Sequence, residues 1–314
     1  MSDTDAPRKA PRRWWLLAPY IALGVALGFA SLYWLWARST FDTELHKRAD
    51  TLRRAGYTLE INDMSFGGWP SRLEVKLDRV RIRAPSGWGL TARDLTAGAL
   101  LYDLGHWVVA DSGGLTVTRP EGGDIDIAGD AIRASLAGFD APTPRIAIEG
   151  VNLKFHPATG ARPFSLADAA RLELYTRPST DGTSAEALLR FDGVSLAPGT
   201  ILTTLASSHR LSGAFALRLT RFGAWKGHDW TSSGRAWAKA GGRVEFDPTA
   251  APSADLAVIC DRGALTFGED GRPEGELPLA FVFPKAERIS AHLSFDDGVT
   301  RLGPVRLGPA PRLF

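Results

Sequence analysis

An uninterrupted apolar run from Trp14 to Trp36, without one charged residue, constrains this chain more than any other feature. As a helix rising about 1.5 Å per residue, the run reaches about 34 Å, which exceeds the roughly 30 Å hydrocarbon core of a bilayer. Tryptophan and tyrosine stand at both ends, where amphipathic rings are favoured at headgroup level. The run predicts a single membrane-spanning helix over residues 14–36, with everything after it on one side of the membrane.

The flanks of the run predict its orientation. Residues 1–13 are polar and contain proline, which indicates a disordered cytoplasmic arm. Four basic residues closely precede the run, and Arg38 is the only one close behind it, so the near flanks favour a cytoplasmic N-terminus. If the basic residues between Lys47 and Arg54 are also counted, the two flanks carry similar numbers of positive charges. Long domains, however, translocate regardless of charge. The four preceding residues are Arg8, Lys9, Arg12 and Arg13.

A cleaved signal peptide is the competing interpretation. Gly28 and Ala30 suit the small-residue positions of a cleavage site. The apolar run is nevertheless longer than the usual core of a signal, and the bulky residues 31–36 continue it past that site. An uncleaved anchor is the preferred prediction.

Composition narrows the classes of function. The formal net charge is +2 and no basic stripe with interleaved aromatics occurs, so we expect no nucleic-acid partner. Cys260 is the only cysteine, which excludes an intrachain disulfide, and its apolar surroundings predict a small buried residue rather than a nucleophile. The six histidines are scattered without the spacing of a metal motif, and no cofactor is expected.

Two hydrophobic periods follow the anchor. Residues 37–56 carry a helical stripe that includes Phe41, Leu45 and Leu52, which predicts a stalk helix. From Tyr57 onward the period is two, in short runs separated by turn residues at roughly ten-residue spacing, which is typical of antiparallel strands. The runs are 57–61, 73–82, 91–101, 107–118, 125–136, 145–155, 170–176, 187–196, 214–220, 234–246, 254–267, 276–283 and 289–307.

The predicted fold is therefore mainly β, with long antiparallel, curved sheets, an N-terminal transmembrane helix, a stalk helix and one short internal helix. Residues 57–314 form the β domain, and glycine pairs such as Gly113–Gly114 supply tight turns. A one-residue slip in the alternation before Val80 indicates a β-bulge. Helical spacing between Pro198 and His209 places the short helix there, with a domain seam near 198–210.

Several segments carry a resemblance to a known family. They are Gly56–Tyr57, Ser65–Leu73 (SFGGWPSRL), Trp88, Ala97–Asp103 (AGALLYD) and His106 near the start, Leu172–Pro178 in the middle, and Asp297–Pro311, a hairpin followed by two Gly-Pro steps, at the end. Together they resemble the bacterial family catalogued as domain of unknown function 2125 (DUF2125), over the whole chain after the anchor. The motif residues taken as structural are Gly68, Pro70, Arg72, Gly298, Gly303, Pro304, Gly308 and Pro309.

The resemblance implies a protein anchored in the inner membrane of Gram-negative bacteria, single-pass, with its β domain in the periplasm. It implies no catalytic residues. A looser, architectural likeness extends to envelope proteins that handle lipids on long curved sheets.

A search for catalytic motifs finds no nucleophile elbow and no phosphate-binding loop. Asp124, Asp126 and Asp130 faintly match a calcium loop, but apolar strand residues separate them, which favours exposed carboxylates. Residues 228–233 (HDWTSS) bring His, Asp and Ser together in sequence only, which predicts a polar loop. We expect no enzymatic activity.

The tryptophans after the anchor are the more informative residues. Core packing explains most of them, but Trp69, Trp225 and Trp230 stand in glycine-containing loops and are candidates for lining a groove or touching the membrane face. The leading hypothesis is an envelope protein that binds a lipid or other hydrophobic ligand on an apolar sheet face. The alternatives are a scaffold subunit that recruits an envelope protein partner and, last, an envelope hydrolase.

Overall fold

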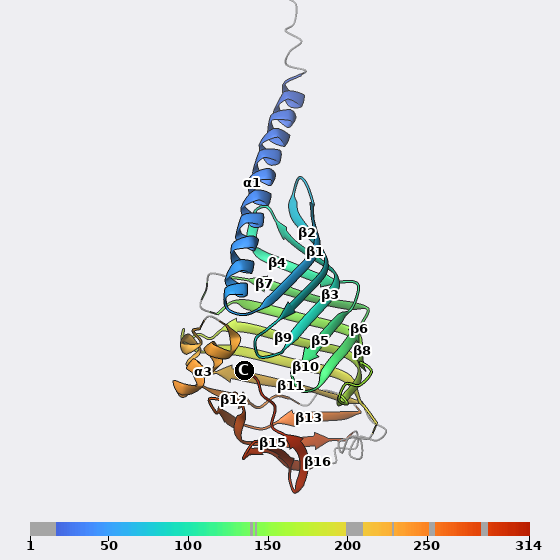
Figure 1. Ribbon diagram of the computed structural model, residues 1–314, viewed down its shortest axis with the longest axis vertical. Coiled ribbons are helices and arrows are strands. Elements are labelled where there is room, and N and C mark those ends of the chain that lie inside the picture. Colours follow the sequence, from blue (N-terminus) through green and yellow to red (C-terminus); the bar gives the residue numbers. More distant parts are fainter. Residues whose placement is uncertain are drawn as a thin grey trace, which may run out of the picture.

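The computed structural model describes residues 17–138, 141, 143–198, 210–227, 229–250, 255–283 and 288–314. A long N-terminal helix leads into one 18-stranded sheet that carries a short helical insertion (Figure 1). The helices are α1 (Ala18–Arg54), the 3-10 turn η2 (Phe222–Ala224) and α3 (Trp230–Lys239). The strands are β1 (Thr58–Gly67), β2 (Arg72–Arg83), β3 (Gly89–Leu100), β4 (Asp103–Asp111), β5 (Leu115–Arg119), β6 (Gly123–Ala128), β7 (Ala131–Ala137), β8 (Arg145–Pro157), β9 (Leu166–Pro178), β10 (Ala185–Leu196), β11 (Leu211–Leu219), β12 (Arg243–Asp247), β13 (Leu256–Cys260), β14 (Gly263–Phe267), β15 (Pro273–Val282), β16 (Arg288–Asp296), β17 (Val299–Leu302) and β18 (Val305–Pro309).

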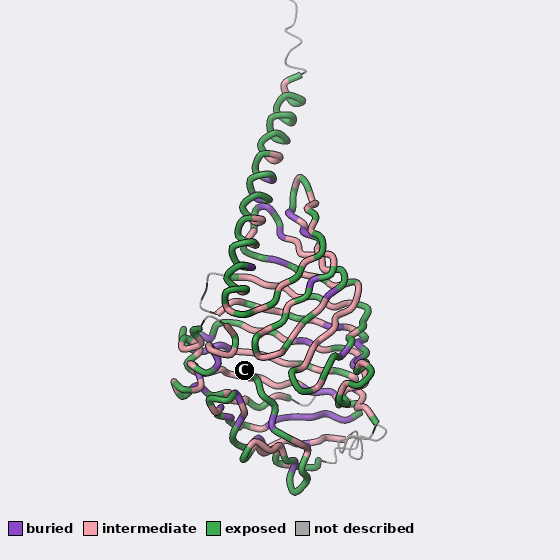
Figure 2. Tube along the Cα trace, in the orientation of Figure 1, coloured by how far each residue is buried: buried purple, intermediate pink, exposed green. Residues whose placement is uncertain are grey.

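Helix α1 joins the predicted membrane span and the predicted stalk without a break. Its first half is long and apolar enough to cross a membrane, and side chains such as Leu23 and Phe29 are exposed there (Figure 2). This part of α1 is therefore a candidate membrane-spanning segment. The helix ends at Arg54, and Gly56 then takes a left-handed backbone (φ 86°) that turns the chain into β1.

The sheet is one continuous ladder that runs from β1 to β18. All its pairs are antiparallel except β11 with β13, which is parallel. Strands β4 and β5 both pair with the same side of β3, one after the other along its length, and β6 and β7 pair with β8 in the same way. Each of these two pairs therefore takes the place of one long strand in the sheet, which we call a row. In Figure 1 the ladder curls so that β1, β2 and β3 cross in front of the strands behind them.

A crease crosses the sheet. On successive strands, the inward-facing side chains are at every second residue up to the crease, and beyond it the other set of alternate residues faces inward. In β2, Leu77 packs inward before the crease and Val80 after it. Arg79 lies between them with a left-handed backbone (φ 45°). The β1–β2 register continues unshifted past this residue, because β1 reverses its alternation at the opposite position. The predicted slip is present, but the expected β-bulge is wrong, since a bulge would have displaced the pairing.

The crease continues through the middle of the sheet. Gly114, Asn152 and Gly193 also have left-handed backbones, with φ of 82°, 51° and 57°. The Asn152 side chain donates to Asp130 Oδ2 at 2.6 Å, which satisfies a polar pair at the joint. Gly113–Gly114 therefore connects β4 to β5 along one row and does not form the predicted tight hairpin turn, because these two strands do not pair with each other.

Two hydrophobic cores lie at opposite ends of the same sheet face. At the first, Trp34, Ala37 and Phe41 of α1 pack against inward residues of β1–β4, such as Val75 and Trp107. At the second, α3 and the C-terminal residue Phe314 cover β11–β16 around the buried Trp237. A third cluster around Phe155 lines β6 and β8–β11.

Helix α3 replaces two predicted elements. Residues 228–233 were expected to form a polar loop and 234–246 a strand, yet a helix runs from Trp230 to Lys239 and β12 begins only at Arg243. Asp229 and Ser232 form a reciprocal capping box, which is a strong helix start. The predicted short helix and the domain seam at 198–210 lie almost entirely outside the described residues.

Candidate functional site

An apolar row crosses nine neighbouring strands on the face that bears the cores. Each member lies directly opposite the next in the strand register, so all their side chains share this inner face. The row is Phe66, Val75, Ala97, Val109, Ala134, Ile148, Leu174, Leu189 and Phe215. A sheet face of this kind must be covered by protein or by another apolar molecule.

The cover is uneven along the row. Helix α1 packs over Phe66 and Val75 at one end, and α3 with the C-terminus packs near Phe215 at the other. Between these ends, Leu174 and Leu189 are only partly buried and Ile148 is 41% exposed. Among the described residues, the middle of this row is thus partly exposed between two covered ends, whereas the third cluster buries the part of the same strands that lies across the crease.

Aromatic side chains form the far rim of this surface. Trp225 lies 4.8 Å from Trp230 and 5.4 Å from Trp237, measured between ring centroids. Trp230 is 55% exposed, and its indole donates to the Leu313 carbonyl at 2.6 Å. Its backbone N–H donates to the Tyr57 hydroxyl at 3.3 Å, which joins α3 to the start of β1. This contact places the inner face on the concave side of the curl.

Trp69 contacts the middle of α1, far from Trp230. It occupies the β1–β2 turn, is 52% exposed and donates from its indole to Ser31 Oγ of α1 at 3.1 Å. From Ser31 to Arg54 the helix extends about 35 Å. The structure therefore groups Trp225 with Trp230 and separates both from Trp69.

The family-motif residues near the start shape a turn against α1. Gly68 has φ 89°, and a side chain there would meet the Arg72 carbonyl oxygen at 2.7 Å. That carbonyl accepts from the Trp34 indole at 3.0 Å, and Pro70 lies in the same turn. Close backbone approach explains why this turn uses glycine.

The motif residues near the end shape two hairpins. Gly298 (φ 70°) follows Asp297 (φ 48°) in the β16–β17 turn, as the Asp-Gly pair predicts. Gly303 (φ 55°) and Pro304 make the β17–β18 turn, and Gly308 and Pro309 end β18. These residues contact no part of the inner row in the described contacts and serve the fold.

A ladder of charged side chains crosses the middle strands on the opposite face of the sheet. Glu149 lies 2.6 Å from Arg133 Nε and also pairs with Arg171, and the hydrogen bonds from these two guanidiniums lower its pKa. Arg171 and Arg190 lie 3.2 Å and 3.6 Å from Glu173. This ladder crosses β7–β10, and its three arginines are exposed whereas Glu173 is buried.

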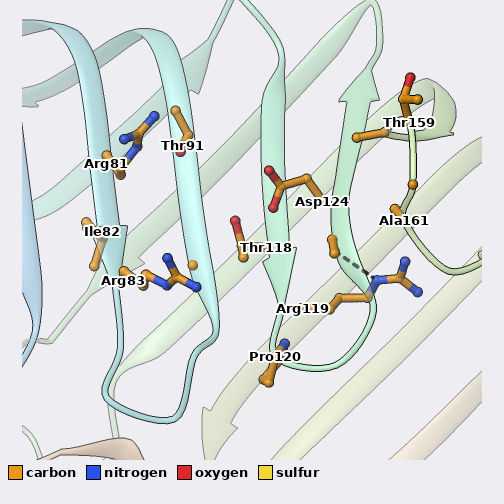
Figure 3. A pocket seen from close by; sticks show the side chains of 14 residues that line it. Arg81, Ile82, Arg83, Thr91, Thr118, Arg119, Pro120, Asp124, Thr159 and Ala161 are labelled. Carbon is orange, nitrogen blue, oxygen red and sulfur yellow. Dashed lines mark hydrogen bonds between the residues drawn. The ribbon is translucent and has the colours of Figure 1, made fainter.

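A polar hollow of about 600 Å³ lies on the outer face near the β5–β6 turn (Figure 3). Arg81, Arg83, Thr118 and Asp124 point toward it. Arg119 is not available to a ligand, because its guanidinium donates to the carbonyls of residues 122, 123, 162 and 163. Arg119 therefore holds the neighbouring loop in place and does not offer its charge to the hollow.

Asp111 is the charged exception on the inner face, opposite Leu95 and Ile132. One carboxylate oxygen accepts from Gly114 N at 2.6 Å, and the other has no hydrogen-bond partner within the described parts of the chain. Burial raises the pKa of this carboxyl above its usual value.

Asp229 and Cys260, the remaining candidates, have structural positions. Asp229 caps α3, so the predicted polar loop is, from Asp229 to Ser233, the start of a helix. Cys260 is buried as predicted, and desolvation raises the pKa of its thiol to about 11, which leaves it protonated at neutral pH. The described residues contain no group of three metal-ligating side chains.

The positions of three residues in the structure were not predicted from the sequence. Tyr57 and Tyr102 lie within the segments that resemble the family, but local sequence does not indicate that Tyr57 contacts Trp230 or that Tyr102 is 84% exposed. Asp111 could have been found from its position in the alternation of β4, where a charge replaces an apolar residue.

Comparisons with known proteins agree with the sequence resemblance. The family model described as "Uncharacterized protein conserved in bacteria (DUF2125)" matches residues 34–286, about four fifths of the chain. The match includes the opening block and the central strand and ends before the Gly-Pro motif at 297–311. No curated protein and no solved structure matches the chain significantly. The chain therefore belongs to the DUF2125 family of bacterial proteins.

Proposed function

We propose that this protein holds a lipid or another hydrophobic molecule on the inner face of its sheet. The observation that carries the proposal is the row from Phe66 to Phe215, whose middle members Ile148, Leu174 and Leu189 are partly exposed between two covered ends. Leaving several apolar side chains in water costs about 25 cal/mol per Å², so an apolar occupant is favoured. The aromatic rim at Trp225 and Trp230 flanks the same face.

The proposal includes the location of the protein in the cell. Helix α1 anchors the protein in the bacterial inner membrane with its N-terminus in the cytoplasm, and the β domain lies in the periplasm. The near-flank charges around the apolar run support this orientation. A non-enzymatic role is also proposed, and the use of Asp229 in a helix cap and the protonated state of Cys260 support it.

Two adjacent leucines in β10 allow a matched test. Leu189 points to the inner face, opposite Leu174, and Leu188 points to the outer face, opposite Tyr175. Both are partly buried. We would place the photo-crosslinker p-benzoylphenylalanine at either position in the full-length chain, irradiate Gram-negative cells expressing it, and identify adducts by mass spectrometry.

A lipid-sized adduct at position 189 and none at 188 is the expected result. A protein adduct at 189 would instead support the scaffold alternative, in which the same face packs on a partner. Equal lipid labelling at both positions, or none at 189 in folded protein, would refute the proposal. Leu189→Glu should likewise reduce the co-purified lipid, and Leu188→Glu should not.

A further inference from the structure

Three side chains of α1 bind the tips of two β-hairpins. The Trp69 indole donates to Ser31 Oγ at 3.1 Å, and the Trp34 indole donates to the Arg72 carbonyl at 3.0 Å, so the β1–β2 tip is held on the helix. The Tyr33 hydroxyl donates to the Leu101 carbonyl at 3.1 Å, which holds the β3–β4 tip. Figure 1 shows the β1–β2 hairpin rising beside the helix.

These contacts define the depth of the tips relative to the membrane span. Ser31, Tyr33 and Trp34 belong to the uncharged run that ends at Trp36, and the first charge after it is Arg38. Ser31 lies about 7 Å along the helix axis on the membrane side of Trp36. If α1 spans the bilayer, the β1–β2 tip reaches the level of the hydrocarbon boundary.

The side chains at the tips suit that level. Residues 67–71 contain no charge, and Trp69 is 52% exposed. At the neighbouring tip, Leu100 is 42% exposed and Tyr102 is 84% exposed. Tryptophan and tyrosine are the residues that favour the membrane interface.

Charged groups begin one level farther from the membrane. The Arg38 guanidinium lies 4.9 Å from the centre of the Phe66 ring, and Arg72 lies 3.4 Å from Glu74. The exposed faces of Leu32, Leu35 and Trp36 on the helix continue the apolar surface of the tips. The uncharged surface of the helix and the tips ends at a charged boundary, which includes Asp103, the residue after Tyr102 that lies opposite Leu100 in the strand register.

We propose that the β1–β2 and β3–β4 tips, with Trp69 and Tyr102, insert into the leaflet of the membrane that faces the β domain. The occupant of this surface is the bilayer spanned by α1. The inference goes beyond the proposed function, since it holds whatever the inner face binds. It implies that the β domain rests on the membrane and does not stand off from it on a flexible stalk.

The test uses single cysteines in the full-length chain with Cys260→Ala as background. Trp69→Cys and Tyr102→Cys report on the tips. Trp88→Cys is the matched control, because Trp88 is an exposed aromatic (40%) just before β3, at the far end of the β2–β3 pair. Each variant carries the fluorophore NBD in vesicles of phosphatidylethanolamine and phosphatidylglycerol, with doxyl-labelled lipid or iodide as quencher.

We expect blue-shifted emission and several-fold stronger quenching by doxyl lipid at positions 69 and 102 than at 88, with iodide showing the reverse order. Equal quenching at all three positions would overturn the proposal. Should labelling disturb the fold, brominated lipid provides a second measurement on unlabelled protein. The loss of quenchable tryptophan fluorescence should then be larger for Trp69→Phe than for Trp88→Phe, and equal losses would also overturn it.

Discussion

Indole groups fasten the helices of this protein to its sheet. The Trp34 and Trp237 rings are buried, and each donates its N–H to a backbone carbonyl, Arg72 at 3.0 Å and Thr220 at 2.6 Å. A buried tryptophan contributes a large apolar area but requires a partner for its donor. These residues therefore set both the position and the orientation of α1 and α3.

The C-terminal residue offers a sharp test of packing at the residue scale. Phe314 is 6% exposed and lies 6.0 Å from Trp225 and 6.2 Å from Phe267, between ring centroids, whereas Leu313 is 48% exposed. Phe314→Ala should lower the free energy of unfolding by about 3–5 kcal/mol, as expected for a buried phenylalanine. Leu313→Ala should change it far less. Urea unfolding followed by near-UV circular dichroism measures both, and similar losses would contradict the packing described.

A pH dependence follows from the β9–β10 turn. Backbone N–H groups of Thr183 and Ser184 donate to Asp181 Oδ1 at 2.8 Å each and lower its pKa from 3.8 to about 2. Because the folded pKa is depressed, the stabilisation is present above about pH 4 and is lost as the pH falls toward 2. The melting-temperature difference between the wild type and Asp181→Asn should shrink over this interval. Thr180→Ala, in the same turn, should keep the wild-type slope, and a constant difference for Asp181→Asn would count against this assignment.

At the scale of elements, the crease explains how one sheet covers two cores. Alternation buries one face of a strand, and a reversal at the same level on neighbouring strands keeps the same face apolar while the sheet turns. The reversal requires left-handed backbone at Arg79 and Asn152. Arginine is an unusual residue for this conformation, which favours glycine.

Substitution at Arg79 tests the crease. Its side chain is 69% exposed and its ion pair with Asp78 is 3.4 Å long, so little stability is lost with the side chain. Arg79→Gly should be at least as stable as the wild type, and Arg79→Val should be less stable than Arg79→Gly by about 1–2 kcal/mol, the cost of left-handed backbone in a residue with a Cβ. Thermal unfolding of both variants checks the order. The reverse order would show that residue 79 is not left-handed.

The elements differ in how far local pattern predicted them. The period of two identified the long strands because one face of each is buried, as in β2 and β9. Helix α3 was missed because it begins inside the loop-like HDWTSS segment and contains Gly234, a poor helix former, although the Asp229 and Ser232 capping box was present in the sequence. The turn assigned to Gly113–Gly114 was wrong because glycine marks a break in direction without specifying which strands pair.

For the whole molecule, the important contacts join segments that are far apart in sequence. Tyr57 meets Trp230, and Trp69 meets Ser31. The first holds the start of β1 against α3 and so closes the curl at one side. The second holds a hairpin tip against the apolar half of α1. Neither pair has a sequence signal. The first depends on how many rows the sheet contains before it curls back, and the second depends on how the β1–β2 hairpin packs against α1.

The amino-acid sequence by itself determined the candidate membrane-spanning helix, the β class and the family. Each depends on a local property: an uncharged run long enough for a bilayer, a period of two, and short motifs such as SFGGWPSRL. Only the tertiary structure decided which strands pair across the crease, which part of the inner face stays uncovered, and that Trp69 lies apart from Trp225 and Trp230. Those properties arise from long-range register and from the packing of α1 and α3, and hydrophobic periodicity does not encode either one.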